Sequence, residues 1–229
     1  MNNLKECYKI INDEEALKQF IEWLPELKDN EVFYVSLFAR KKYAPETGFI
    51  KSNDKTQLSR FTATKDTLLQ KIKKLEVPVG TYQLKEIQAP QDALVLYIMP
   101  NPRCMKKATK LMGKKCWKLM EANNFNIHQE AMSCIQRSKS YAYVIDFDID
   151  TKEVTWDALK QILPNDCYSI VETKGGYHIL VYPEKTKNRL EIAKDWYRKI
   201  TQAYPVDQGG DQLLPVPGCV QSVFTPKFI

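Results

Sequence analysis

The stretch Tyr141-Ala-Tyr-Val-Ile-Asp-Phe-Asp-Ile-Asp150 is an apolar run that ends with an acid at every second position. Because successive side chains of a β-strand point to opposite faces, Asp146 and Asp148 share one face of the strand predicted here. Two neighbouring carboxylates repel each other, and a divalent cation relieves that repulsion, since Mg²⁺ and Mn²⁺ prefer carboxylate oxygens. The stretch therefore predicts either a metal site on a strand or a strand that runs into an acidic turn.

The residues from Ser140 onward are predicted to form a β-α-β-β-α-β unit. Its expected elements are strand 141–147, helix 155–163, strand 167–173, strand 177–182, helix 187–202 and a last strand within 212–224. This order is that of ferredoxin-like and RRM-like folds. In such folds the first and third strands are central neighbours and the fourth flanks the first. We expect the helices to cover one face of the sheet and to leave the other open.

Polar residues from three separate segments are predicted to meet on that open face. Asp146 and Asp148 lie on the first strand, and His178 lies at the start of the third. Asp207 and Asp211 lead into the fourth. The predicted topology thus brings acids and one imidazole together from distant parts of the chain.

Gly175 and Gly176 precede His178 and have two readings. They suit a tight hairpin turn, and they equally suit a close approach of the backbone to a phosphate group. The sequence leaves both readings open.

The residues before this unit are predicted to form an αβ lobe. Its expected elements are a helix from 12 to 24, strand 31–40, helix 64–75, strand 93–99 ending at Pro100-Asn-Pro102, a helix from Arg103 and a short helix 128–136. The helix that begins at Arg103 is rich in lysine. Lysines so close together repel each other, and a nucleic-acid backbone would relieve this, although a solvated helix face is the alternative. The candidates for such phosphate contacts are Lys106, Lys107, Lys110 and Lys114, with Arg40-Lys41-Lys42 as a second group.

Composition narrows the function classes. The chain has 229 residues and a net charge of +6, which permits a nucleic-acid partner without requiring one. Its six cysteines contain no C-x-x-C pair and are expected to be reduced thiols, and its two histidines exclude a multi-histidine metal site. No apolar run is long enough to cross a membrane, and the first residues lack a secretory signal. We therefore expect a cytoplasmic protein, encoded by a cell, a phage or a plasmid, with no membrane partner.

The ordered motifs resemble those of the archaeo-eukaryotic primase superfamily, especially the primase-polymerases of phages and plasmids. The family's hydrophobic-Asp-hydrophobic-Asp motif is matched by Ile145-Asp-Phe-Asp148, and its small-x-His motif by Thr173-Lys-Gly-Gly-Tyr-His178. Val206-Asp207 resembles the third motif, and Asn101-Pro-Arg103 resembles a segment of phage members. The resemblance covers residues 90–220 well. Pro215 and Cys219 depart from it, since Arg and Thr are common at those places.

The resemblance implies an α+β, two-lobed catalytic core. One domain, 1–229, would comprise an N-terminal αβ lobe, 1–138, and an RRM-like catalytic lobe, 139–229. The implied activity is metal-dependent nucleotidyl transfer: a DNA primase or primase-polymerase that makes or extends primers on single-stranded DNA from NTPs or dNTPs. It also leaves room for a separate helicase or priming subunit as a partner.

The resemblance also implies roles for particular residues. Asp146, Asp148 and Asp207 would hold two Mg²⁺ or Mn²⁺ ions, with Asp211 as the alternative third acid. The residues implied in contacts with the incoming triphosphate are His178, Thr173, Lys174, Gly176 and Arg103. Lys106, Lys107, Lys110 and Lys114 would contact the template.

Two other function classes remain open from the sequence. Glu172-Thr-Lys174, downstream of an acidic strand end, is similar to the Asp…Glu-x-Lys pattern of metal-dependent nucleases. Lys174 to Tyr182 partly resembles the third-strand signature of an RRM, which predicts a non-catalytic nucleic-acid-binding module that stacks bases on aromatic side chains.

Overall fold

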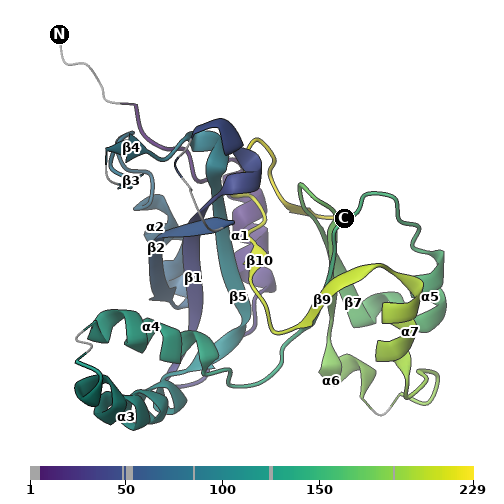
Figure 1. Ribbon diagram of the computed structural model, residues 1–229. Helices are drawn as coiled ribbons and strands as arrows, with labels where there is room; N and C mark the ends of the chain where they lie inside the picture. Colours follow the sequence, from purple (N-terminus) through teal and green to yellow (C-terminus); the bar gives the residue numbers. More distant parts are fainter. Residues whose placement is uncertain (1–5, 48, 50–53, 85, 124–125, 188) are drawn as a thin grey trace.

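The chain folds into a mixed α+β structure built on two antiparallel sheets with helices packed against them (Figure 1). This computed structural model describes residues 6–47, 49, 54–84, 86–123, 126–187 and 189–229. Among these residues no helix has both the length and the apolar character needed to cross a bilayer.

The first sheet has the strand order β10-β5-β1-β2. Its strands are β1 (Glu31–Arg40), β2 (Lys55–Ala63), β5 (Leu94–Cys104) and β10 (Leu214–Pro215). A small hairpin, β3 (Gln83–Leu84) with β4 (Ile87–Gln88), lies beside it. β1 has the ends predicted from the sequence, whereas β2 lies where no strand was predicted.

Two helices cover one face of the first sheet. They are α1 (Glu14–Trp23), which begins where the Asp13 carboxylate accepts a bond from the Ala16 N–H, and α2 (Lys65–Lys73). Leu17 and Phe20 of α1 pack with the alternate β1 residues Val35 and Leu37 in the larger core. The predicted amphipathic helix therefore forms because its apolar stripe is buried against this face.

The other face of the first sheet carries a helical pair at one end. α3 (Met105–Glu121) and α4 (Ile127–Arg137) lie together at the lower left of Figure 1. Tyr34 and Met99 of the sheet pack there against Ala108 of α3 and Met132 of α4. The rest of this face is left to form one wall of a cleft.

The second sheet has the order β11-β7-β8-β6-β9, and every pairing in it is antiparallel. Its strands are β6 (Ile145–Ile149), β7 (Tyr168–Glu172), β8 (Tyr177–Val181), β9 (Val206–Gly210) and β11 (Lys227–Phe228). The predicted neighbours are confirmed: β6 lies between β8 and β9. The fourth strand of the predicted unit is β9 at 206–210, so its predicted position within 212–224 was wrong; β10, which does lie in that range, belongs to the first sheet.

Helices α5 (Asp157–Ile162) and α7 (Trp196–Ala203) cover one face of the second sheet. Phe147 and Ile179 of the sheet pack there against Leu159 of α5 and Ile200 of α7. The short helix α6 (Pro183–Thr186) lies between β8 and α7.

The face that carries the acids is not open along its whole length, contrary to prediction. Val144, Val171, Leu180 and Tyr182 belong to the core of the first sheet and contact its α1 side. Only the end of this face that carries Asp148 borders a cleft. The two sheets therefore share one hydrophobic core, which fixes their relative position.

The segment 214–222 joins the first sheet before β11 returns to the second. Leu214 and Pro215 pair with Ile98 and Tyr97 of β5, and the Leu96 N–H donates to the Val220 carbonyl. Gly218 has a φ of +80°, and a Cβ there would lie 2.4 Å from the Asp13 carbonyl oxygen. Part of the segment 139–229, which was expected to form one lobe, therefore pairs with a strand of the lobe expected at 1–138.

Two other expected elements differ. β5 continues through Pro100-Asn-Pro102, because its register with β1 shifts between the pairs Val32–Arg103 and Tyr34–Met99, and a proline without an N–H is tolerated at such an irregularity. The predicted helix 187–202 is shortened to α7, because the residues before it bury Ile192 in the second core and leave Leu190 fully exposed.

Candidate functional site

The register between β6 and β8 places the predicted acids and histidine together. Asp148 lies opposite His178, and Asp146 lies opposite Leu180. The Nδ1 atom of His178 is 2.8 and 3.0 Å from the two carboxylate oxygens of Asp146, and Nε2 is 3.5 Å from an oxygen of Asp148. The imidazole therefore bridges two carboxylates on one face of the sheet, as the strand alternation predicted.

Burial and charge act against each other at this bridge. Burial lowers the pKa of His178, but the charge of Asp146, its hydrogen bond and the charge of Asp148 raise it, and the net shift is upward. Burial raises the pKa of Asp148; His178 opposes this, while Asp146, Asp150 and Asp207 add to it. The histidine is thus stabilised as a cation, and Asp148 sits where added positive charge would favour its ionised form.

Asp207 and Asp211 have different surroundings. β9 pairs Gln208 with Asp148 and Val206 with Ile149, so Asp207 is the extra residue of a bulge. Its exposed side chain lines the cleft and makes no ion pair or hydrogen bond with a described residue. Of the two candidates for the third acid, Asp207 is the one whose carboxylate remains available.

Asp211 instead pairs with Arg103. The Arg103 side chain is fully buried, and its Nη1 and Nη2 donate to the two carboxylate oxygens of Asp211 at 2.9 and 2.5 Å. Asn101 donates to the same carboxylate and accepts from the N–H groups of Tyr143 and Val144. Asn101-Pro-Arg103 therefore joins β5 to the segment before β6 and to the segment after β9. Arg103 does not line the cleft, so the structure does not bring it to the triphosphate position expected from the sequence.

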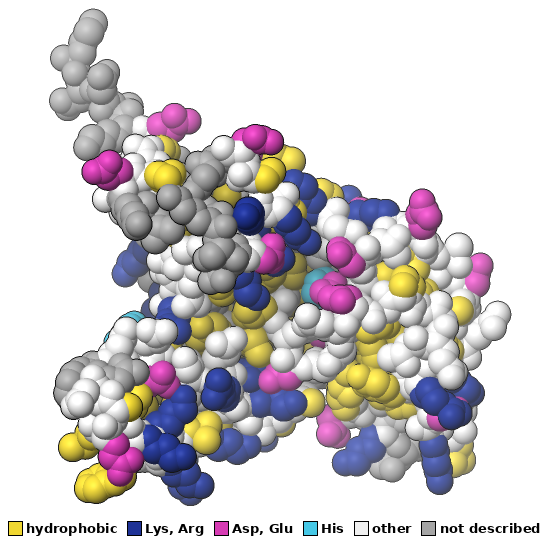
Figure 2. All heavy atoms as spheres, viewed as in Figure 1, with side chains coloured by type: hydrophobic (Ala, Val, Ile, Leu, Met, Phe, Trp, Pro, Cys, Tyr) yellow, Lys and Arg dark blue, Asp and Glu magenta, His cyan; other side chains and the backbone are white. Residues whose placement is uncertain are grey.

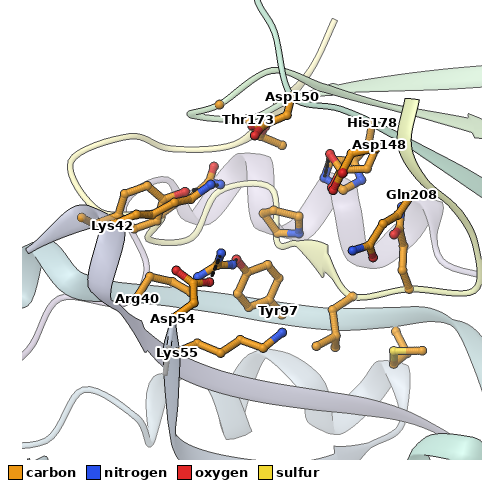
Figure 3. A pocket seen from close by; sticks show the side chains of 18 of the residues that line it. Arg40, Lys42, Asp54, Lys55, Tyr97, Asp148, Asp150, Thr173, His178 and Gln208 are labelled. Carbon is orange, nitrogen blue, oxygen red and sulfur yellow. Dashed lines mark hydrogen bonds and ion pairs between the residues drawn. The ribbon is translucent and has the colours of Figure 1, made fainter. Parts of the chain in front are cut away.

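A cleft of about 460 Å³ lies between the two sheets. Figure 2 shows acidic side chains and a histidine gathered at this hollow. The second sheet and its loops contribute acids, and the end of the first sheet contributes basic side chains on the facing wall (Figure 3). The charged residues that line it include Asp148, Asp150, Asp207, Arg40, Lys42 and Lys55.

The hairpin glycines have a structural role. A Cβ on Gly176 would lie 1.8 Å from the Ile149 carbonyl oxygen, and one on Gly175 would lie 2.5 Å from an Asp150 carboxylate oxygen. Of the two readings open from the sequence, the hairpin is the one whose packing is observed, because the turn between β7 and β8 lies directly on the end of β6. The backbone that Gly176 approaches closely is that of β6, at Ile149.

Thr173 and Lys174 lie at the edge of the cleft. The Thr173 hydroxyl accepts a bond from the Gly176 N–H at 3.3 Å and lines the cleft. The Lys174 ammonium donates to the Ser222 hydroxyl at 2.7 Å and lies 4.4 Å from the centre of the Tyr43 ring. Lys174 is therefore near the cleft, but its ammonium group is already bound to Ser222 and lies over the Tyr43 ring.

The four template candidates lie on α3, apart from the cleft. Lys107 donates to the backbone carbonyls of Lys139 and Ser140. Lys106, Lys110 and Lys114 are exposed. None of the four lines the cleft, so they form a separate basic surface.

The fit to a divalent cation rests on two carboxylates. Asp146 is almost fully buried and has both oxygens turned to His178, whereas Asp148 and Asp207 face the cleft. Within the described ranges, no group of three or more His, Cys, Asp and Glu side chains is arranged to hold a metal ion. The oxygen chemistry of Asp148 and Asp207 suits Mg²⁺ or Mn²⁺, which keep several waters when bound by one or two carboxylates.

Sequence reasoning missed several residues of the cleft. Tyr97 lies in an apolar strand and Lys55 begins a strand that was not predicted, so neither gave a functional signal. Asp150 was visible as the last acid of the opening stretch but was not assigned a role. Only their convergence with Asp148 shows that they border one site.

Comparisons with protein-family models, with curated proteins and with solved structures find no match. The function is therefore inferred from the residues of this chain.

Proposed function

We propose that the protein is a metal-dependent nucleotidyltransferase of the primase-polymerase type, which makes or extends primers on single-stranded DNA. The single observation that carries the proposal is the meeting of Asp148, His178 and Asp207 from three neighbouring strands at a cleft with a basic facing wall. A triphosphate with a bound divalent cation needs acidic side chains that bind the cation and basic side chains that bind the phosphates. The two-lobed core implied by the resemblance to archaeo-eukaryotic primases is part of this proposal.

In the proposed reaction Asp148 and Asp207 would hold Mg²⁺ or Mn²⁺. The bound cation would lower the pKa of the attacking 3′-hydroxyl and neutralise charge on the triphosphate and on the departing pyrophosphate. Asp146 accepts the Nδ1 proton of His178 and fixes the orientation of the ring. The Nε2 side then faces Asp148 and the cleft, where it can donate to a phosphate oxygen.

The remaining roles are also proposals. Thr173 is placed to contact a nucleotide in the cleft, and Lys174 would do so only after leaving Ser222. Three exposed lysines of α3, Lys106, Lys110 and Lys114, would contact the template strand outside the cleft, and Lys107 would do so only after leaving the carbonyls of Lys139 and Ser140. A separate helicase or priming subunit would be a further partner.

The two other function classes receive less support. Glu172, which a nuclease of the Glu-x-Lys type needs beside its acids, instead pairs with Lys152 at 2.7 Å and with Lys227 at 3.5 Å. An RRM-like module needs an accessible sheet face, but Leu180 and Tyr182 are buried in the core. The nuclease reading therefore lacks a free Glu172 carboxylate, and the RRM-like reading lacks an accessible sheet face.

The test is primer extension on single-stranded DNA with Mn²⁺ or Mg²⁺ and nucleotides. We expect wild-type protein to add nucleotides, EDTA to stop the reaction, and Asp148→Asn or Asp207→Asn to reduce the rate by about a hundredfold or more, since metal-held charge stabilisation is worth several kcal/mol.

Asp166→Asn is the matched control. Asp166 is an exposed acid that pairs with Arg189 outside the cleft, so its replacement changes the net charge equally. We expect this variant to keep wild-type activity. Undiminished synthesis by Asp148→Asn and Asp207→Asn would refute the proposal.

A further inference from the structure

Arg40 is the last residue of β1 and stands on the basic wall of the cleft (Figure 3). Its Nη1 donates to the Tyr97 hydroxyl oxygen at 2.8 Å, and its Nη2 lies 2.5 Å from a carboxylate oxygen of Asp54. Its Nε atom is buried and has no hydrogen-bond partner among the described residues. The guanidinium is thus bonded to Tyr97 through Nη1, whereas of the other two nitrogens only Nη2 has a partner.

The unsatisfied side is the one that recognises paired oxygens. Nε and Nη2 of an arginine form a fork that matches two oxygens of a carboxylate or a phosphate. Asp54 engages Nη2 alone and leaves Nε unpaired, which carries the cost of a buried donor without an acceptor. A ligand that offered two oxygens would satisfy both donors.

Tyr97 keeps the guanidinium in place for such a ligand. The Tyr97 side chain is buried in β5, and burial raises its pKa to about 12, so it stays a neutral phenol at physiological pH. Because the phenol oxygen fixes Nη1, the fork keeps its direction when the partner of Nη2 changes.

Asp54 is the partner that can leave. Its side chain is 55% exposed, whereas that of Arg40 is 17% exposed, so the carboxylate can turn to water while the guanidinium stays. Exposed ion pairs of this kind contribute little to stability. Lys42 and Lys55 line the same wall. The positive charge of this wall exceeds the single negative charge of Asp54, which favours the binding of a further anion.

We propose that Arg40 is a phosphate-binding residue and that Asp54 occupies its guanidinium until a phosphate group replaces it. Asp54 then acts as an internal competitor that weakens phosphate binding in the absence of substrate. The phosphate belongs either to a nucleotide triphosphate or to a nucleic-acid backbone. This ligand class rests on the proposed function, but the exchange itself needs no catalysis.

Binding is measured at low ionic strength in EDTA with two probes: inorganic tripolyphosphate, and a single-stranded oligonucleotide without terminal phosphates. We expect Asp54→Asn to tighten binding of at least one probe roughly fivefold, because it removes one nearby negative charge. We expect Arg40→Gln to weaken the same probe by about tenfold or more, since hydrogen bonds to charged groups are worth about 1.5–3 kcal/mol. The probe that responds identifies the source of the phosphate.

The double variant and a matched control separate the exchange from a general charge effect. In Arg40→Gln the additional change Asp54→Asn should give at most a small gain, because the competitor has lost its target. Asp166→Asn breaks another arginine pair, Asp166–Arg189, with a similarly exposed carboxylate and should leave binding of both probes unchanged. Melting temperatures report whether each variant is folded.

Four outcomes would overturn the proposal: no gain with Asp54→Asn, an equal gain when Arg40 is already replaced, an equal gain with Asp166→Asn, or no binding of either probe by any variant. The outcome does not depend on nucleotide incorporation, since EDTA removes the cation. Primer extension can therefore fail while the exchange stands, and the exchange can fail while primer extension stands.

Discussion

Asp146 and Asp148 are equivalent in the sequence, but they differ in their surroundings. Asp146 is 1% exposed and faces His178 with both oxygens, whereas the Asp148 side chain is 33% exposed and borders the cleft. Strand alternation predicts only that they share a face. How deeply each carboxylate is buried depends on where the core of the first sheet ends.

This difference leads to a prediction about stability. Asp146→Ala leaves a buried imidazolium without its main partner, which costs about 3–5 kcal/mol in comparable buried pairs. We expect urea denaturation to show this loss, and we expect Asp148→Ala to cost less because its carboxylate is partly hydrated. Equal unfolding midpoints for Asp146→Ala and wild type would show that the pair does not stabilise the fold.

Among the elements, the β7–β8 hairpin depends on the absence of a side chain at Gly176. The Ile149 carbonyl oxygen occupies the position that a Cβ would take, and this oxygen belongs to the backbone of a central strand. Since the strand cannot move without disturbing its pairing with β8 and β9, the hairpin would have to shift instead.

Gly176→Ala is therefore expected to destabilise the protein by about 1–3 kcal/mol or more, as overpacking does. The neighbouring Gly175→Ala is the matched comparison, because its Cβ would meet only the end of the Asp150 side chain, which can rotate away. Thermal unfolding of the two variants measures the difference. A larger loss in Gly175→Ala than in Gly176→Ala would contradict this account of the turn.

Local pattern predicted some elements better than others. The helix that begins after Asp13 and the strand β1 were predicted well because their apolar residues follow one period and are buried on one face. The helix predicted at 187–202 was confirmed only from Trp196 onward. Its Leu190 fits a helical stripe, but the described residues between Lys187 and Asp195 follow a turn that buries Ile192 instead. Periodicity cannot show which of two nearby apolar residues will reach a core.

In the molecule as a whole, one buried ion pair connects the two sheets. Arg103 extends from the end of β5, and Asp211 follows β9, so the pair closes the chain across both sheets. Its partner Asn101 also binds the backbone that enters β6. This network holds the strand that carries Asp146 and Asp148 in a fixed position relative to the first sheet.

Asp211→Ala is expected to cost about 3–5 kcal/mol, because it leaves the fully buried Arg103 guanidinium without a counter-charge. Replacing both residues, with Arg103→Met and Asp211→Ala, should be less damaging than the sum of the two single changes. Denaturant unfolding of the four proteins gives the coupling energy. A coupling energy near zero would mean that the pair does not hold the sheets together.

The amino-acid sequence by itself determined the local features: strands such as β1, β7 and β8, and which face of β6 carries the acids. Chain connectivity also predicted that β6 lies beside β8. These depend on residue spacing and chain connectivity, which are local properties. Only the tertiary structure decided that 214–220 returns to the first sheet, that Arg103 is bound to Asp211, and that Arg40 faces the acids across a cleft. Those outcomes depend on how two sheets bury a shared core, and contacts between residues distant in the chain leave no periodic trace in the sequence.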